Sequence, residues 1–331
     1  MDITTVASDL IVTHGGAHEM RLADLHAGTT YHIGGVAVTT PLPPRGALLS
    51  RFATVNDVHF GETECGRVDG MEGGPIVRVL PGEPPYPVTM NSGAVADILA
   101  AGISTLVVKG DLSVDGRDDE WEMFERCYRD SFGDSLYAVR GNHDAYHGQD
   151  RYAGDTLVEL PGVTIALLDT VIPLQTTGTI TAAQIDWLDA VAAVSTSPMI
   201  VMGHHQQWVE GTRSDAYFGI HPDASDALDA VATRRPSIVA YAAGHTHRHR
   251  VRPMRCGIPS IEVGCVKDFP GTWAEYRVYD GGIAQVVHRV SSPAALSWSE
   301  RCRGLMADFG FDYSTYALGR LEDRCFNIPL R

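Results

Sequence analysis

The chain has 331 residues, of which 26 are Lys or Arg and 41 are Asp or Glu, so its formal net charge is −15. This charge has the wrong sign for general binding to nucleic acid polymers or to anionic membranes. No segment approaches the roughly 18 apolar residues of a membrane span, and MDITTVASDLIVTHGG lacks the basic and apolar regions of a signal peptide, so we expect a cytoplasmic protein.

Residues 1–48 contain short strand-like runs, including DLIVTH and TTYHIGGVAVTT, and end at PLPPRG. We interpret them as an N-terminal β extension packed on a catalytic domain at 49–291. The extension could instead bind another subunit, which leaves a homodimer open.

The apolar run FATV leads into NDVHFG, which contains Asp57 and His59. Side chains two positions apart on an extended segment point the same way, so both can reach one site. An insertion at 61–91, rich in glycine and proline, follows directly. Because it must pass near these residues, a substrate lid and a passive surface loop are equally good interpretations.

Helical and strand-like patterns then alternate. Helices are predicted at 92–102, 118–132, 181–194 and 223–235, with four residues that can cap their first turns: Ser92, Asp118, Thr181 and Asp223. Between them, the strand-like runs STLVV, LYAV, MIVM and SIVAYAA precede the polar motifs KGD, RGNHD, GHH and GHTH. A glycine precedes the first candidate ligand of each motif, which suits a tight strand exit and a close approach of the backbone.

Segments 258–264, 273–280 and 283–290 alternate apolar and polar residues, so we expect antiparallel strands. Together with the earlier repeats they predict an α/β fold, a two-sheet β-sandwich flanked by helices. The tail at 292–331 is too aromatic and apolar for a solvated linker, and we expect a helix and an extended end docked on the core or on a partner subunit. Its Cys302 and Cys325 could pair, but reduced thiols are the expectation in the cytoplasm.

The polar motifs all follow predicted strands, and ligands of α/β proteins gather beyond the carboxyl ends of strands. Three oxygen donors and four imidazoles, with no cysteine, fit two divalent or trivalent metal ions that share a carboxylate, with manganese, iron and zinc as candidates. The candidate ligands are Asp57, His59, Asp111, Asn142, His204, His245 and His247.

Other polar residues near the motifs have a less specific interpretation. We expect His205 to form a structural hydrogen bond rather than to bind metal, and His249 could lie near the rim of the pocket. Arg248 and Arg250 could meet a phosphate, although solvated charge is the commoner explanation for such residues.

The motifs D-x-H, G-D, G-N-H-D, H-H and G-H-x-H, in this order over about residues 51 to 290, resemble those of the calcineurin-like metallophosphoesterase superfamily. The resemblance implies a β-sandwich flanked by helices, with one metal ion bound by Asp57, His59 and His247. It implies a second ion bound by Asn142, His204 and His245, with Asp111 as the bridge. It also implies that His143 faces the substrate phosphate and the leaving oxygen, and that Asp144 lies behind His143 and orients its ring.

Within this superfamily, DVHFG, the GHTH block and the chain length are most similar to bacterial class III cyclic nucleotide phosphodiesterases. The resemblance implies a small-molecule phosphodiester substrate, such as a cyclic nucleotide, attacked by a hydroxide that bridges the metals. A nucleotide pyrophosphatase and a phosphomonoesterase stay open as alternatives. A catalytically silent metal-binding scaffold is another, although such relatives usually lose ligands and this chain has them all.

Overall fold

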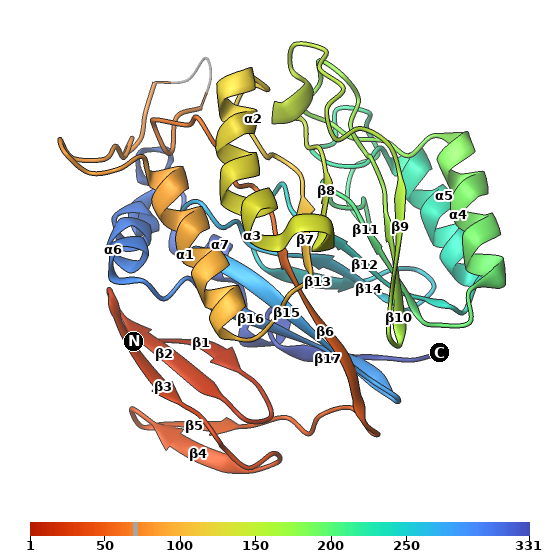
Figure 1. Cartoon of the computed structure of the whole chain (residues 1–331), viewed down its shortest axis with the longest axis horizontal. Helices are drawn as coiled ribbons and strands as arrows, with labels where there is room; N and C mark the ends of the chain where they lie inside the picture. Colours follow the sequence, from red (N-terminus) through yellow and green to blue (C-terminus); the bar gives the residue numbers. More distant parts are fainter. Residues whose placement is uncertain (69–71) are drawn as a thin grey trace.

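Two six-stranded sheets face each other at the centre of the computed structural model, which describes residues 1–68 and 72–331. Helices cover the outer face of each sheet, with α4 and α5 on one side and α1, α2 and α6 on the other (Figure 1). The predicted α/β fold, a two-sheet β-sandwich flanked by helices, is confirmed.

The first sheet has the strand order β17-β16-β15-β6-β7-β8. Its strands are β6 (Leu48–Val55), β7 (Leu106–Lys109), β8 (Leu136–Val139), β15 (Thr272–Tyr279), β16 (Gly282–Arg289) and β17 (Phe326–Pro329). Strands β6, β7 and β8 run parallel, whereas β15, β16 and β17 are added antiparallel. Three strands of this sheet therefore end at the same edge.

The second sheet has the order β13-β14-β12-β11-β10-β9. Its strands are β9 (Thr156–Leu160), β10 (Val163–Leu167), β11 (Met199–Met202), β12 (Ile238–Ala243), β13 (Arg250–Pro253) and β14 (Pro259–Glu262). The antiparallel prediction for 258–264 was incomplete, because β14 pairs antiparallel with β13 but parallel with β12. The β13–β14 hairpin inserts its second strand beside β12, so that strand runs in the same direction as β12.

The alternation of side chains along each strand produces separate apolar layers. In β7, Val107 packs between the sheets, whereas Leu106 and Val108 pack against the helices. In β11, Ile200 faces the first sheet and Val201 faces the layer of α4 and α5. All five side chains are fully buried, and each contributes about 1.5–3 kcal/mol by leaving water. The strands are thereby fixed in a rigid frame.

The helices are α1 (Tyr86–Ala100), α2 (Asp118–Phe124), α3 (Asp130–Phe132), α4 (Ala182–Val194), α5 (Pro222–Arg234), α6 (Pro293–Arg301) and α7 (Tyr313–Leu318). A π-helical turn at Glu125–Arg129 joins α2 to α3, and short 3₁₀ turns lie at Gly133–Ser135, His143–Ala145, Cys302–Gly304, Ala307–Phe309 and Leu321–Asp323.

The helix predicted at 92–102 begins six residues earlier, at Tyr86. Proline is tolerated in a first helical turn, where its missing N–H needs no partner, so Pro87 does not delay the start. Thr181 caps α4 as predicted, since its hydroxyl accepts a hydrogen bond from the Gln184 N–H. The helices predicted from 118 and 223 follow Arg117 and His221, so Asp118 and Asp223 lie within first turns rather than at caps.

The N-terminal segment forms a three-stranded sheet and a hairpin. Its strands are β1 (Asp2–Val6), β2 (Ile11–Gly15), β3 (His18–Leu22), β4 (Thr30–Ile33) and β5 (Val36–Thr39). The Thr5 hydroxyl donates to the Val287 carbonyl of β16 at 2.6 Å, so the extension contacts the first sheet.

The C-terminal tail docks on its own chain. Strand β17 pairs with β16, and Trp298 of α6 stacks on Tyr86 of α1 at 4.2 Å between ring centroids.

The described part of the 61–91 insertion packs against the tail. Glu83 forms an ion pair with Arg301 at 2.9 Å, and the Asp308 N–H donates to the Gly74 carbonyl at 3.0 Å. Residues 69–71 of the insertion lie outside the described residues. The insertion therefore contacts the C-terminal tail.

In the described ranges, no helix combines the length and apolar character needed to cross a bilayer. All six cysteines, Cys302 and Cys325 among them, are free thiols. The cytoplasmic location and the homodimer stay predictions.

Candidate metal centre

The polar motifs meet at one end of the sandwich. Each of five strands is followed by the first candidate ligand of its motif: Asp57 after β6, Asp111 after β7, Asn142 after β8, His204 after β11 and His245 after β12. Since these strands are parallel within their sheets, their carboxyl ends share an edge. Six of the seven candidate ligands are buried, and His247 is partly buried.

Five of these residues have a left-handed backbone conformation that residues other than glycine rarely adopt. Their φ angles are positive, between 47° and 67°: Asp57, His59, Asp111, His245 and His247. Such a conformation costs of order 1–3 kcal/mol per residue and occurs mainly at functional sites. The surrounding sheets thus hold the motifs in a geometry that their own backbone does not favour.

One group of donors is built around Asp57, His59 and His247, which can offer one ligand atom each within 4.8 Å of one another. His247 Nε2 lies 3.5 Å from Asp57 Oδ1. The carboxylate of Asp57 is fixed by the side-chain amide of Asn56 at 2.5 Å and by the His245 N–H at 3.1 Å. On the far side of its ring, His247 Nδ1 lies 3.2 Å from Asp268 Oδ2, which directs Nε2 toward Asp57.

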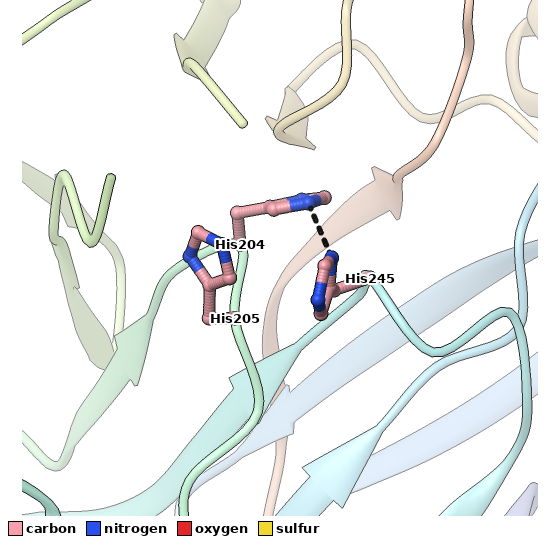
Figure 2. Close-up of side chains that lie close together, drawn as sticks. All are labelled: His204, His205 and His245. Carbon is pink, nitrogen blue, oxygen red and sulfur yellow. Dashed lines mark hydrogen bonds between the residues drawn. The ribbon is translucent and has the colours of Figure 1, made fainter. Parts of the chain in front are cut away.

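The second group is built around His204. Its Nδ1 donates to the carbonyl of Lys109 at 2.9 Å, so Nε2 is directed into the site. There Nε2 lies 3.2 Å from His245 Nδ1 (Figure 2). It also lies 3.0 Å from Asn142 Oδ1. The Asn142 amide is oriented by donating from Nδ2 to the Tyr146 hydroxyl at 2.6 Å. Three positioned groups therefore present oxygen or nitrogen atoms to the same region.

Asp111 lies between the two groups. Its Oδ2 is 3.3 Å from His59 Nε2 on one side and 3.3 Å from His204 Nε2 on the other. Its Oδ1 accepts the backbone N–H of His143 at 3.0 Å, which fixes the carboxylate plane. A carboxylate in this position can be shared by two cations.

The donor set fits metal ions. Both ring nitrogens of His59 and Nε2 of His245 are buried without a hydrogen-bond partner among the described residues. A buried polar atom left unpaired costs free energy, and a cation among these lone pairs removes that cost. The arrangement is open and rich in oxygen and imidazole, as expected for a reactive centre rather than for a closed cysteine site.

The protonation states also suit cation binding. Burial opposes ionisation of Asp57, but the charge of His247 lowers the pKa of Asp57 to about 2. Burial, together with the charges of Lys267 and His143, lowers the pKa of His59 to about 4. Burial disfavours charge on His204 as well, yet the negative charge of Asp111 raises the His204 pKa to about 9. The site thus attracts positive charge, here a proton, to the position between Asp111 and Asn142.

The glycines before the motifs make room for ligands of other motifs. A Cβ on Gly110 would lie 2.4 Å from the His204 ring, and one on Gly244 would lie 2.8 Å from Asp57 Oδ2. A Cβ on Gly141 would lie 2.2 Å from Asp111 Oδ1. The sequence predicted close approach at these glycines, and the structure identifies what approaches each one.

His143 lies beside this cluster, with its ring centroid 4.5 Å from that of His59. The expectation that Asp144 orients the His143 ring is wrong. His143 Nδ1 instead donates to the Val114 carbonyl at 2.9 Å. The Asp144 carboxylate accepts hydrogen bonds from the backbone N–H groups of Gly141, Leu112 and Ser113 at 2.7–2.9 Å. Asp144 therefore fixes the backbone of two motifs, and the Ser113 hydroxyl, rather than the His143 ring.

His205 and His249 have structural partners. His205 leaves the chain on the side opposite His204 (Figure 2), and its ring nitrogens contact the Thr170 hydroxyl at 2.8 Å and the Thr176 carbonyl at 3.2 Å. The His205 ring also lies near those of His204 and His245, with centroids 4.9 and 4.6 Å away, and the three residues could offer ligand atoms within 4.8 Å of one another. That His205 does not bind metal therefore stays a prediction. His249 is buried and accepts the Gly264 N–H at 3.1 Å, so it does not lie at a pocket rim.

Three residues of the site were not predicted. Asp268 contacts His247, and Tyr313 of the tail donates its hydroxyl to Asp268 Oδ1 at 2.7 Å. Phe218 stacks on His245 with 4.0 Å between ring centroids. None belongs to a repeated motif, and only the acidic character of Asp268 in VKDFP gave a signal that could have been followed.

Comparison with known proteins identifies a family and similar folds. A family model described as calcineurin-like phosphoesterase matches residues 50–249. A probable cyclic nucleotide phosphodiesterase of Synechococcus sp. is 29% identical over 150 residues. That alignment covers 43% of this chain and 57% of the relative, so this chain spans little more than half of the relative's length.

Two solved structures share the fold at low identity. A dimetal phosphatase from Danio rerio has a TM-score of 0.56 and 14% identity, and the match covers 72% of this chain and 96% of that one. Purple acid phosphatase PPD1 from yellow lupin has a TM-score of 0.53 and 12% identity, with 83% and 60% covered. At these identities the likeness concerns the arrangement of sheets and helices.

Proposed function

The chain belongs to the calcineurin-like phosphoesterase family, and we propose that it hydrolyses a small phosphodiester, such as a cyclic nucleotide, with the help of two metal ions. One observation carries the proposal: buried oxygen and nitrogen donors from five motifs converge with their lone pairs facing one another. Such an arrangement is favourable only with cations among the donors. The choice of a diester is supported by the likeness to the Synechococcus protein.

We assign the ligands in two sets. One ion would be held by Asp57, His59 and His247. The other would be held by Asn142, His204 and His245, with Asp111 shared between the two. When bound, the ions would supply positive charge to the phosphoryl oxygens and lower the pKa of the water that attacks phosphorus. Manganese, iron and zinc all accept this mixture of oxygen and imidazole ligands.

His143 is the proposed catalytic acid. Because its Nδ1–H is held by the Val114 carbonyl, the proton for transfer must be on Nε2. Its ring nitrogen, His59 and Asp111 can offer atoms within 4.8 Å of one another, so the ring borders the space where phosphorus would lie. In its protonated form His143 would donate to the leaving oxygen as the ester bond breaks. Asp144 supports this role indirectly by fixing the adjacent backbone.

The test is product analysis by phosphorus NMR with metal-reconstituted protein. The substrates are 3′,5′-cyclic AMP and a nucleoside diphosphate compound, and the His143→Ala variant serves as the control. Conversion of the cyclic nucleotide to a monoester supports the proposal, provided that the variant is slow. Cleavage of only the diphosphate would favour a nucleotide pyrophosphatase. Absence of turnover of either, with both ions bound, would favour the scaffold alternative.

A further inference from the structure

A hollow of about 400 Å³ adjoins the candidate metal centre, within the range of about 300–1,000 Å³ typical of small-molecule sites. Thr246, which separates His245 from His247 in the chain, is part of its lining. Phe218, which stacks on His245, is another part. The hollow therefore lies directly beside the candidate ligands His245 and His247.

We propose that this hollow, the arginine pocket, binds a second phosphate and the planar base of the substrate, so that the enzyme prefers nucleotide-type phosphodiesters with a phosphate beyond the scissile one. The inference rests on the proposed function and specifies its substrate class. Its charged residues are Arg248, Arg250, Arg252 and Glu210, and its aromatic residues include Tyr316 of the tail.

The positive charge of the arginine pocket comes from one face of an edge strand. Residues two apart on a strand point to the same side, so Arg250 and Arg252 of β13 share a face, and Arg248 just before the strand joins them in the lining. One buried carboxylate, Glu262, contacts both Arg248 Nε at 2.7 Å and Arg252 Nη2 at 3.1 Å. Since Glu210 pairs with Arg250, three guanidinium groups face two carboxylates, which leaves a positive excess of one in a chain of net charge −15.

Of the three arginines, Arg250 forms the most exposed ion pair. Its Nη2 lies 3.3 Å from Glu210 Oε1, and the two side chains are 39% and 68% exposed. Ion pairs in such exposed positions contribute little free energy, so a phosphate can replace Glu210. Arg248 and Arg252 are only 20% and 9% exposed, which argues against the interpretation of this cluster as merely solvated charge.

Aromatic side chains supply the rest of the lining. The Arg248 guanidinium lies over the Tyr316 ring at 5.0 Å, and the Tyr316 hydroxyl donates to the Thr246 carbonyl at 2.9 Å. Phe218 is 51% exposed although it stacks on His245, so one ring face is available to a ligand. Nucleobases stack favourably on such aromatic rings. An aromatic surface beside guanidinium groups matches a base linked to a phosphate.

The test compares matched substrates and a matched pair of variants. The substrates are the dinucleotide ApA and its 5′-phosphorylated form pApA, hydrolysed by the metal-reconstituted enzyme. We expect kcat/KM to be at least about tenfold higher for pApA, and Arg250→Ala to bring this ratio close to one. Arg255→Ala removes an exposed arginine that pairs with Asp226 outside the arginine pocket, and it should leave the ratio unchanged.

A binding measurement separates the pocket from the chemistry. Calorimetry with metal-free protein should show tighter binding of adenosine 5′-monophosphate than of adenosine, and Arg250→Ala should remove the difference. Equal binding of the two compounds by the wild type would overturn the inference, as would equal losses in Arg250→Ala and Arg255→Ala. If bis(4-nitrophenyl) phosphate and both dinucleotides resist hydrolysis, the proposed function fails, whereas the preference for the monophosphate still decides the inference about the arginine pocket.

Discussion

The two sides of the metal centre are held in place by different parts of the molecule. On one side, His204 is oriented by the backbone carbonyl of Lys109, at the end of a central strand. On the other side, His247 is oriented by the side chain of Asp268, which accepts a hydrogen bond from Tyr313 of the tail. Asp268 and Tyr313 lie outside residues 50–249, the part that matches the family model. The core sheets thus orient His204, whereas the orientation of His247 depends on residues that follow the part matching the family model.

The largest effect is expected from removing a ligand close to both sides. His245→Ala should abolish activity and lower the metal content, because it removes an imidazole whose Nδ1 contacts His204 and whose buried Nε2 has no hydrogen-bond partner among the described residues. Metal analysis after reconstitution, alongside hydrolysis assays, checks this. His147→Ala, in an exposed position, is the control and should retain both properties. A His245→Ala protein with full metal content would contradict the proposed ligand set.

His143→Ala should separate rate from metal binding. We expect kcat to fall by about 10²–10⁴-fold, the usual contribution of a general acid, while both metal ions remain bound. Rapid-quench or steady-state kinetics with metal analysis of the same sample gives the answer. The assignment fails if turnover stays near the wild-type value, or if metal is lost as in His245→Ala.

Asp268→Asn should weaken one side of the centre only. Changes to residues that orient a metal-bound histidine typically cost about 10–100-fold in metal affinity or activity. Competition with a chelator should therefore show one weakened ion and one that is unaffected.

Tyr313→Phe should act in the same direction with a smaller effect, because it leaves the Asp268 carboxylate in place. The control is Tyr31→Phe, whose hydroxyl accepts a hydrogen bond from the exposed His26 N–H of the N-terminal extension. Equal weakening of both ions by Tyr313→Phe would show that the tail supports the whole centre rather than one side.

The smallest effect on the centre is expected from shortening the insertion between Arg67 and Arg78. Loop closure changes slowly with length, so stability should change by less than about 1 kcal/mol. We expect metal content to stay intact while the relative rates on different phosphodiesters change. Unchanged rates on every substrate would identify the segment as a passive surface loop.

The strands and the motifs after them were predictable because each apolar run and the polar residues that follow it lie close together in the sequence. The apolar run before Asp111 could only be a buried strand, and β7 occupies it. Contacts between distant residues were not predictable: His247 and Asp268 are 21 residues apart, and Tyr313 lies 45 residues beyond Asp268. The role expected for Asp144 was wrong because backbone N–H groups, which no side-chain pattern reveals, provide its partners.

The close approaches at Gly110 and Gly244 have a consequence for how the protein reaches its active form. Gly110 belongs to the first sheet and makes room for His204 of the second, while Gly244 of the second makes room for Asp57 of the first. Neither sheet alone can present a complete set of donors. During refolding, tight metal uptake should therefore appear only after the two sheets have docked, so it would report a late step of assembly.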